Sequence, residues 1–284
     1  MNSISAILDD IKIQHTVFAM PFAVMSAFIA AQGAPGWVKL GLIIVAMVFA
    51  RSAAMAFNRL TDERFDRLNP RTEKRALPAG RATRTQYILF TTVSCAAFIA
   101  VCGMINQMAL ILSPVALLIV FFYSYTKRFT AYSHFILGLA LALAPLGAWV
   151  AVREEISAQP ILLGAAVIFW LAGLDTIYSC QDVEFDRHSG LKSIPQRFGV
   201  KRALNMAALF HVVMVVLLLA LALVSTLSWI YIIGVLFTGA MLWYEHSLVK
   251  PDDLTKVNVA FFNMNGIISI GLMIFTLTDV LVTR

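Results

Sequence analysis

Long stretches without a charged residue constrain this sequence more than any other feature. Residues 13–38, 87–126, 129–152, 203–244 and 257–278 contain no Asp, Glu, Lys or Arg. A transmembrane helix needs roughly 20 mostly apolar residues, and the second stretch is long enough for two. Only 13% of the 284 residues are charged, compared with about 25% in soluble domains. The chain is therefore expected to form one all-α, multi-pass membrane domain over residues 1–284.

The apolar stretches divide into nine expected transmembrane helices, at about 14–33, 37–57, 87–104, 107–125, 133–152, 160–180, 205–224, 228–246 and 258–279. Nine spans place the two long charged loops, 58–86 and 181–204, on the same side of the membrane. Most of the 22 Lys and Arg residues also fall on that side, which the positive-inside rule makes cytoplasmic. The net charge of +6 then reflects membrane topology, and no nucleic-acid partner is expected.

The first charged loop opens with three oxygen-bearing side chains, Asn58, Asp62 and Asp66, at intervals of four residues. On a continuing helix these side chains would lie on one face. Magnesium usually takes one or two carboxylates and completes its shell with water and phosphate oxygens. The pattern indicates a magnesium site. The alternative is a solvated helix end whose acids pair with neighbouring arginines.

The second loop repeats the pattern, because Asp182 and Asp186 have the same spacing. Asp175 lies two turns deeper, within an apolar span, where a charge costs on the order of 2.5–3.5 kcal/mol. It therefore needs a polar cavity or a partner. Arg51 is the expected partner, since it precedes Asn58 by the same seven residues that separate Asp175 from Asp182. The alternative is a purely structural Asp–Arg pair.

Both acidic clusters follow an apolar helix on the same expected side. Converging carboxylates need cations to neutralise them, and a complex of magnesium with a diphosphate would do so. Candidate phosphate-binding residues stand beside the acids: Arg71, Arg75, Lys127 and Lys192. Arginine and lysine both hold phosphate oxygens. The alternative for each basic residue is the ordinary charge bias of a cytoplasmic loop.

Together these motifs resemble the UbiA family of intramembrane prenyltransferases over most of the chain. Seven segments carry the resemblance: Asn58-Arg-Leu-Thr-Asp62-Glu-Arg-Phe-Asp66, Asn69-Pro-Arg-Thr72, Arg75-Ala-Leu-Pro-Ala-Gly80, Tyr123-Ser-Tyr-Thr-Lys-Arg128, Asp182-Val-Glu-Phe-Asp186, Gly190-Leu-Lys-Ser193 and Arg197-Phe-Gly199. The variants around Arg51 and Lys192 are similar to a bacterial subgroup labelled 4-hydroxybenzoate polyprenyltransferase. One departure is Arg59, where many members have an acid, and this leaves the number of metal ions open.

The resemblance implies nine helices around a central cavity, in a bacterial cytoplasmic membrane. It implies that Asn58, Asp62, Asp66, Asp182 and Asp186 bind Mg²⁺ and its diphosphate. Arg71, Arg75 and Lys127 would contact the diphosphate, and Arg51 and Asp175 would line the cavity. Tyr178 and Lys192, which flank the second motif, are further candidate substrate-binding residues.

The expected reaction transfers a polyprenyl group from an allylic polyprenyl diphosphate to a hydroxylated aromatic acid, 4-hydroxybenzoate, in respiratory quinone biosynthesis. Some relatives instead resemble enzymes that prenylate a dihydroxynaphthoate on the futalosine route to menaquinone. Metal and basic residues would stabilise the leaving diphosphate, and Asp175 is a candidate proton acceptor. A further hypothesis is an ion-coupled transporter, because acids inside a membrane often mark ion pathways.

Overall fold

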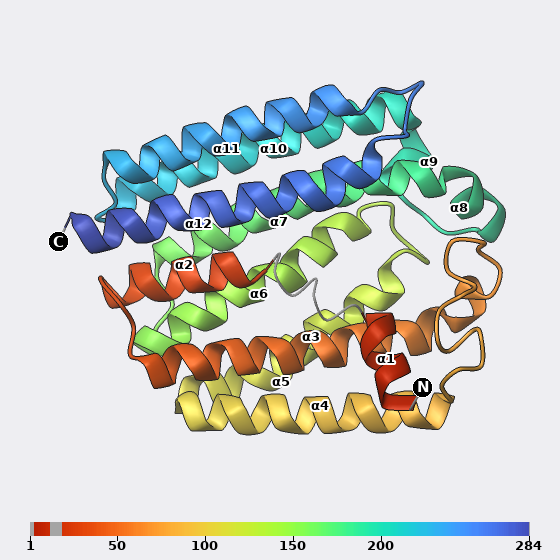
Figure 1. The fold of residues 1–284 in the computed structure, drawn as a ribbon, viewed down its shortest axis with the longest axis horizontal. Coiled ribbons are helices and arrows are strands. Elements are labelled where there is room, and N and C mark those ends of the chain that lie inside the picture. The colour runs from red at the N-terminus through yellow and green to blue at the C-terminus, as the bar shows by residue number, and fades with distance from the viewer. Residues whose placement is uncertain (1–2, 12–18, 284) are drawn as a thin grey trace.

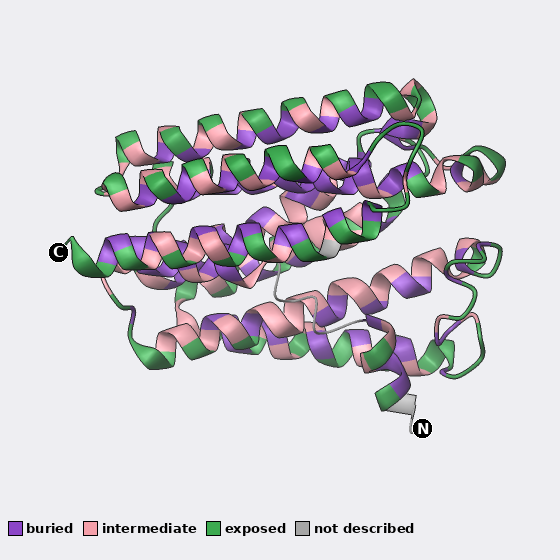
Figure 2. Ribbon diagram, turned by 45° about the horizontal axis from the view of Figure 1, so that its top comes forward, coloured by how far each residue is buried: buried purple, intermediate pink, exposed green. Residues whose placement is uncertain are grey.

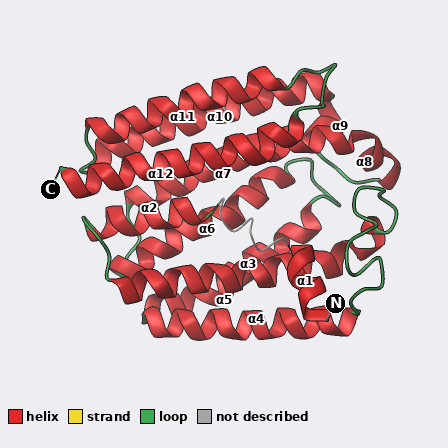
Figure 3. Ribbon diagram, viewed as in Figure 1, coloured by secondary structure: helices red, strands yellow, loops and turns green. Residues whose placement is uncertain are grey.

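The structure, a computed structural model, describes residues 3–11 and 19–283, and no β-strand is found among them (Figure 3). Its helices, in chain order, are α1 (Ser3–Ile11), α2 (Met20–Ala31), α3 (Trp37–Asp66), α4 (Arg84–Ile105), α5 (Gln107–Thr126), α6 (Ser133–Arg153), α7 (Ala158–Ser179), η2 (Cys180–Asp182), α8 (Val183–Ser189), α9 (Ile194–Phe198), α10 (Val200–Val224), α11 (Trp229–Leu248), η3 (Val259–Met264) and α12 (Asn265–Val282). The all-α prediction is confirmed for the described residues.

Seven helical segments in the described part of the chain are long and apolar enough to cross a membrane: Trp37–Asp66, Arg84–Ile105, Gln107–Thr126, Ser133–Arg153, Ala158–Ser189, Val200–Val224 and Val259–Val282. Helices α2 and α11 lie at the other two expected spans. Helix α2 has only 12 residues, and positions 14–18 of its expected span lie outside the described residues. The count of nine therefore stays a prediction.

Among the seven long apolar segments, the one that contains α7 has the largest buried share. Helix α7 packs along α6 and α10 and also touches α2. The fully buried Trp170 of α7 belongs to a core cluster that draws residues from α2, α6, α10, α11 and α12. A separate cluster joins α3, α4 and α5. Figure 2 shows buried residues along the inward faces of the helices and exposed residues on the outside.

The long helices run side by side, and the two motif segments meet at one end of the bundle (Figure 1). We call this the motif end; it carries residues 67–83 and 180–199. Helix α3 continues through the whole first acidic motif before it stops at Asp66. Pro70 follows closely, and proline disfavours a helical residue before it. Helix α4 then begins with a reciprocal cap between Thr83 and Gln86, which satisfies two free backbone N–H groups.

The second acidic motif does not continue a regular helix. Helix α7 ends at Ser179, one turn of 3₁₀ helix follows at Cys180–Asp182, and α8 restarts at Val183. The regular helix suggested by the four-residue spacing of Asp182 and Asp186 is therefore interrupted at Cys180–Asp182. The Cys180 amide bonds to residues within the preceding turn, and such short-range bonds tighten a helix end.

Candidate active site

Asn58, Asp62 and Asp66 lie on one face of α3, as their spacing predicted. The Asn58 amide donates to Asp62 Oδ2 at 2.8 Å. Its own carbonyl oxygen accepts from Arg59 Nη1 at 3.2 Å. Arg59 is buried and pairs with Asp10 of α1, with 3.3 Å between Nε and Oδ2. Arg59 thus connects α1 to α3 and fixes the orientation of the Asn58 side-chain amide.

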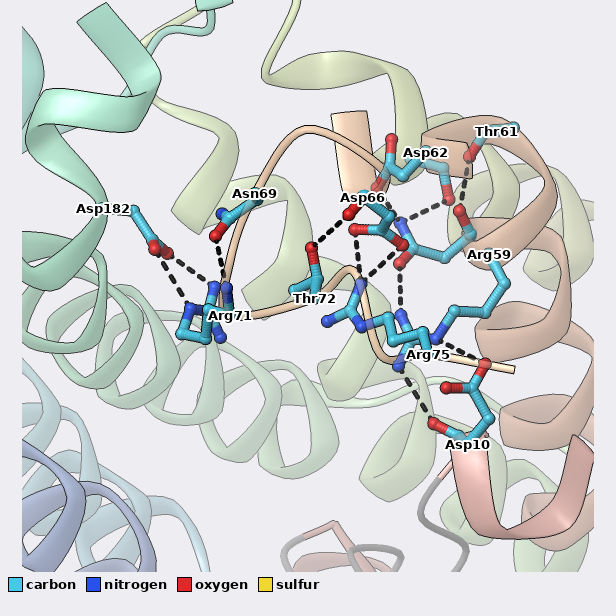
Figure 4. A network of polar contacts seen from close by, with 12 residues as sticks. Asp10, Arg59, Thr61, Asp62, Asp66, Asn69, Arg71, Thr72, Arg75 and Asp182 are labelled. Carbon is cyan, nitrogen blue, oxygen red and sulfur yellow. Dashed lines mark hydrogen bonds and ion pairs between the residues drawn. The ribbon is translucent and has the colours of Figure 1, made fainter. Parts of the chain in front are cut away.

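The segment after α3 folds back onto this cluster (Figure 4). Arg75 Nη1 donates to both Asp66 oxygens, at 2.7 and 2.8 Å. The Thr72 hydroxyl donates to the Asp66 carbonyl at 3.2 Å. The amide of Arg71 donates to Asn69 Oδ1 at 2.9 Å. These bonds turn the Asn69-Pro-Arg-Thr72 motif so that Arg71 reaches across to the second motif.

Arg71 connects the segment after α3 to the second acidic cluster. Its Nε and Nη2 donate to the two carboxylate oxygens of Asp182, at 3.1 and 2.7 Å, and its Nη1 donates to the Tyr178 hydroxyl at 3.0 Å. The guanidinium also stands 5.3 Å from the centre of the Tyr178 ring. Burial alone would lower the pKa of Arg71, but Asp182 and Tyr178 raise it above its usual value. Arg71 is therefore a permanent cation between α3 and α7.

Asp186 is held from the opposite side by α9. Its Oδ2 accepts from the Ser193 hydroxyl at 2.7 Å. The same hydroxyl accepts from the Gln196 amide and caps α9. Asp186 is buried, so this bond compensates part of the cost of enclosing its charge. Ser193 was not among the predicted site residues; its position as the cap residue before Pro195 was the available signal.

Lys127 lies between the clusters, immediately after α5. Burial would lower its pKa, but the carboxylates of Asp175, Asp186 and Asp182 raise it well above the usual value. Within the described residues its ammonium makes no hydrogen bond or ion pair. A half-buried cation surrounded by acids, with free donors, is suited to bind an anion that enters among them.

Asp175 is paired with His134 of α6. Their Nδ1 and Oδ2 atoms are 2.6 Å apart, and His134 Nε2 accepts from the Ile194 amide at 3.3 Å. The backbone N–H can only donate, so the histidine is neutral and its proton is on Nδ1. The helices can approach because Gly138 stands one turn further along α6; a Cβ there would lie 2.6 Å from the Ile168 carbonyl oxygen of α7.

The predicted pairing of Arg51 with Asp175 is wrong. No ion pair forms at Arg51 in the described structure, and its buried Nε has no hydrogen-bond partner. Arg51 and Asp175 occupy matching positions in the two motifs, but this does not bring them into contact. The partner of Asp175 depends on how α6 packs against α7. His134 was missed for the same reason. The only signal was a histidine near the start of an apolar span.

An apolar cavity of about 360 Å³ opens beside the first cluster. It lies among α3, α4, α5 and α6, and Arg51, Asn58 and Tyr123 are among its polar lining groups. Asn58, which bonds to Asp62, therefore belongs to both the cavity and the acidic cluster. The cavity is apolar inside and has the hydrogen-bonded Asn58–Asp62 pair at its opening. Arg51 lies two helical turns before Asn58, and its Nε has no hydrogen-bond partner among the described residues.

Lys192 takes a different position from the other predicted phosphate-binding residues. Its ammonium donates to the Phe129 carbonyl at 3.2 Å, and its amide donates to the Lys127 carbonyl at 2.7 Å. It therefore fastens the second motif segment to the end of α5. A contact between Lys192 and substrate stays a prediction.

The described residues contain no group of three or more His, Cys, Asp or Glu side chains that would hold a metal ion by themselves. Arginines instead hold Asp66 and Asp182. The donor set is made of hard oxygens only, with an acidic pair on each side of the site. Magnesium usually binds through one or two carboxylates and substrate phosphates. The residues therefore fit a magnesium ion that arrives with a diphosphate, and not a preformed protein cage.

Comparison with known proteins gives one consistent result. Residues 19–267 match the UbiA prenyltransferase family. Among curated relatives, the 4-hydroxybenzoate octaprenyltransferase of Psychromonas ingrahamii is 34% identical over 252 residues, covering 87% of this chain and 85% of the relative. The enzyme of the same description from Aliivibrio salmonicida is 32% identical over 84% of this chain and 83% of its own.

Solved structures agree with this match. The apo structure of a UbiA homolog from Aeropyrum pernix K1 has a TM-score of 0.86 and 33% identity, covering 95% of this chain and 99% of that one. A UbiA homolog from Archaeoglobus fulgidus, bound to DMAPP and Mg²⁺, has a TM-score of 0.77 at 22% identity, covering 96% and 98%. The second likeness shows the fold alone.

Proposed function

The chain belongs to the UbiA prenyltransferase family, and from that premise we propose that it transfers a polyprenyl group from its diphosphate to 4-hydroxybenzoate. The family assignment makes the chain a prenyltransferase and an integral membrane protein, and not an ion-coupled transporter. The aromatic acceptor is the finer part of the proposal, and the relatives described as 4-hydroxybenzoate octaprenyltransferases support it.

One observation carries the proposal: Arg71, from the segment that Arg75 ties to Asp66, pairs with Asp182 of η2. Asn58, which bonds to Asp62, also lines the apolar cavity. Diphosphate would bind at Arg71 and Lys127, and the prenyl chain would lie in the cavity. Magnesium, bound through Asp62, Asp66, Asp182 and Asp186, would neutralise the diphosphate and make it a better leaving group.

The cavity walls exclude water, which would otherwise capture the allylic cation. Arg51 is placed to bind the carboxylate of the acceptor, because its buried Nε has no partner and a guanidinium recognises a carboxylate through paired bonds. The acceptor ring forms a new C–C bond and loses a proton. We assign that proton to Oδ1 of Asp175, since Oδ2 is held by His134 and Oδ1 makes no hydrogen bond with a described residue.

We further propose that the motif end faces the cytoplasm, that the bundle crosses the membrane nine times, and that the cavity is the central substrate cavity. The excess of Lys and Arg in the motif segments supports the orientation. The helices found at eight of the expected spans, together with α2 at the first, support the count. Residues 1–284 would then form a single domain.

The test uses the purified protein with Mg²⁺, a polyprenyl diphosphate and either 4-hydroxybenzoate or a dihydroxynaphthoate, with diphosphate release and prenylated product both measured. We expect product with 4-hydroxybenzoate only. Product with the naphthoate alone would refute the acceptor assignment and keep the prenyl transfer.

Two substitutions test the site itself. Asp62→Ala and Asp182→Ala should each abolish product formation with a working acceptor. Glu184→Ala is the matched control, because Glu184 lies between the acids of the second motif but is 74% exposed and pairs only with Arg187. Full activity in both aspartate variants would show that the metal site has been assigned to the wrong residues.

A further inference from the structure

An open groove of about 820 Å³ lies at the motif end, where the end of α3, the start of α4 and the end of α5 meet. Its apolar walls include Phe57 and Leu60 of α3 and Ile88 of α4. Helical residues advance by roughly 100° each, so Phe57 and Leu60 lie on a different side of α3 from Asp62. The apolar walls of the groove therefore face away from Asp62.

Four arginines line this groove: Arg64, Arg67, Arg84 and Arg128. Arg67 and Arg84 share one carboxylate, Glu63, at 2.7 and 2.9 Å, and their side chains are 59% and 61% exposed. Arg64 is exposed and makes no hydrogen bond or ion pair with a described residue. Glu63 is the single acid in the lining, and Arg128 also lies 3.8 Å from Asp62 Oδ1. Four guanidinium groups with two acidic partners leave a net positive charge, which the exposed Arg64, Arg67 and Arg84 present to water.

The helices that form the groove also carry exposed apolar residues beyond it. Ile88 of α4 is 51% exposed, and Val93 is exposed on the next turns of the same helix. Leu118 and Phe122 of α5 are likewise exposed large apolar residues. A ligand of this surface therefore needs an anionic head for the arginines and long apolar chains for α4 and α5. A nucleic acid or a soluble phosphate provides only the first of these.

We propose that the groove binds an anionic phospholipid, with its phosphate on the arginines and its acyl chains along α4 and α5. Arginine pairs with phosphate through parallel hydrogen bonds. Basic residues near an anionic lipid surface contribute about fivefold each to binding. The binding does not depend on the transfer reaction, because the groove uses none of the acidic residues assigned to the diphosphate.

Arg128 connects the groove to the active site. It donates to the Thr61 carbonyl at 2.7 Å and lies 3.8 Å from Asp62 Oδ1. A lipid phosphate in the groove would thus share this guanidinium with the first acidic cluster. Variants that test the groove leave Arg128 unchanged, so that the acidic cluster keeps its contacts.

The test compares retention of phosphatidylglycerol and phosphatidylcholine, with the same acyl chains, by the purified full-length protein in native mass spectrometry. Wild-type protein should prefer phosphatidylglycerol. The variant Arg64→Gln/Arg67→Gln/Arg84→Gln should lose at least about tenfold of that preference, since Glu63 already neutralises part of the charge. The matched control Arg187→Gln/Lys201→Gln/Arg202→Gln changes three exposed basic residues elsewhere at the motif end and should keep it.

A second variant guards against misfolding of the first. Glu63→Gln frees Arg67 and Arg84 from their shared acid and should raise phosphatidylglycerol retention. No preference in wild-type protein, or an equal loss in the control variant, would overturn the proposal. The proposal would also be overturned if the three groove arginines were needed to bind a polyprenyl diphosphate but not to bind phosphatidylglycerol. In that case the groove would be a docking place for the prenyl donor.

Discussion

Replacing His134 tests how Asp175 is held and whether that geometry matters for the reaction. The His134 side chain is fully buried and makes two bonds through different atoms. Nδ1 donates to Asp175 at 2.6 Å and Nε2 accepts from Ile194 at 3.3 Å. An asparagine amide can reproduce the first bond, and a glutamine amide reaches the position of the second. The two substitutions therefore separate the contributions of the two atoms.

The magnitudes follow from the bonds lost. His134→Asn loses a long bond to an amide, worth roughly 0.5–1.5 kcal/mol, whereas His134→Gln loses a bond to a charged group, worth roughly 1.5–3 kcal/mol. The Gln variant also frees the Asp175 carboxylate to rotate. A positioned proton acceptor contributes on the order of 10²–10⁴ in rate. We expect kcat to fall at least about tenfold in His134→Gln and to change little in His134→Asn.

The assay measures kcat and KM separately, together with the thermal unfolding midpoint in detergent. A structural histidine would lower stability in both variants and leave kcat of the folded fraction unchanged. Selective loss of kcat in His134→Gln, with KM for the diphosphate retained, identifies His134 as a positioning residue. Equal kcat in the two variants, at equal folded fraction, would refute the reasoning.

The remaining predictions concern charge and close packing. Arg71→Lys keeps the cation but loses the paired bonds and the Tyr178 contact, so KM for the prenyl diphosphate should rise about tenfold, as measured in initial-rate assays. The folded protein raises the pKa of Lys127 above its value in the unfolded chain, which is about 10.4. The interaction of Lys127 with the carboxylates is therefore fully present below about pH 10.4 and is lost only as pH rises through the higher pKa of the folded state. Activity between pH 6 and 9 should therefore show no titration of Lys127, and Lys127→Met should lower the residual activity at every pH without shifting the pH profile. Gly138→Ala should lower the unfolding midpoint because its Cβ meets the α7 backbone, at a cost of roughly 1–3 kcal/mol, whereas Gly147→Ala on the same helix meets nothing within 4 Å and should not.

The helices were predictable because apolar length and charge bias are local properties of the sequence. The continuous helix from Asn58 to Asp66 was also predictable, since polar residues at intervals of four indicate one face of an α-helix. The break after Ser179 was not, because no proline or glycine marks it. Equal spacing in the two motifs therefore suggested two equivalent helices, and the structure contains one straight helix and one interrupted segment.

Contacts between helices were the part that sequence reasoning missed. Asp175 and His134 are 41 residues apart, and which partner Asp175 meets depends on the rotation of α6 and α7 about their own axes. From charge alone, Arg51 was as good a partner for Asp175 as His134. A buried carboxylate requires a partner, but this requirement does not identify the residue that fulfils it.

The paired arginines explain how a site built from so many acids remains folded without its substrate. Asp66 and Asp182 are each held by one guanidinium, from Arg75 and Arg71, and both arginines come from the single segment that follows α3. A diphosphate with magnesium would carry both charges that this arrangement needs. Its oxygens would take the place of the carboxylates at Arg71 and Arg75, and its metal would take the place of the arginines at Asp66 and Asp182. Since each partner would be exchanged for one of like charge, entry of the complex would leave the local charge balance nearly unchanged.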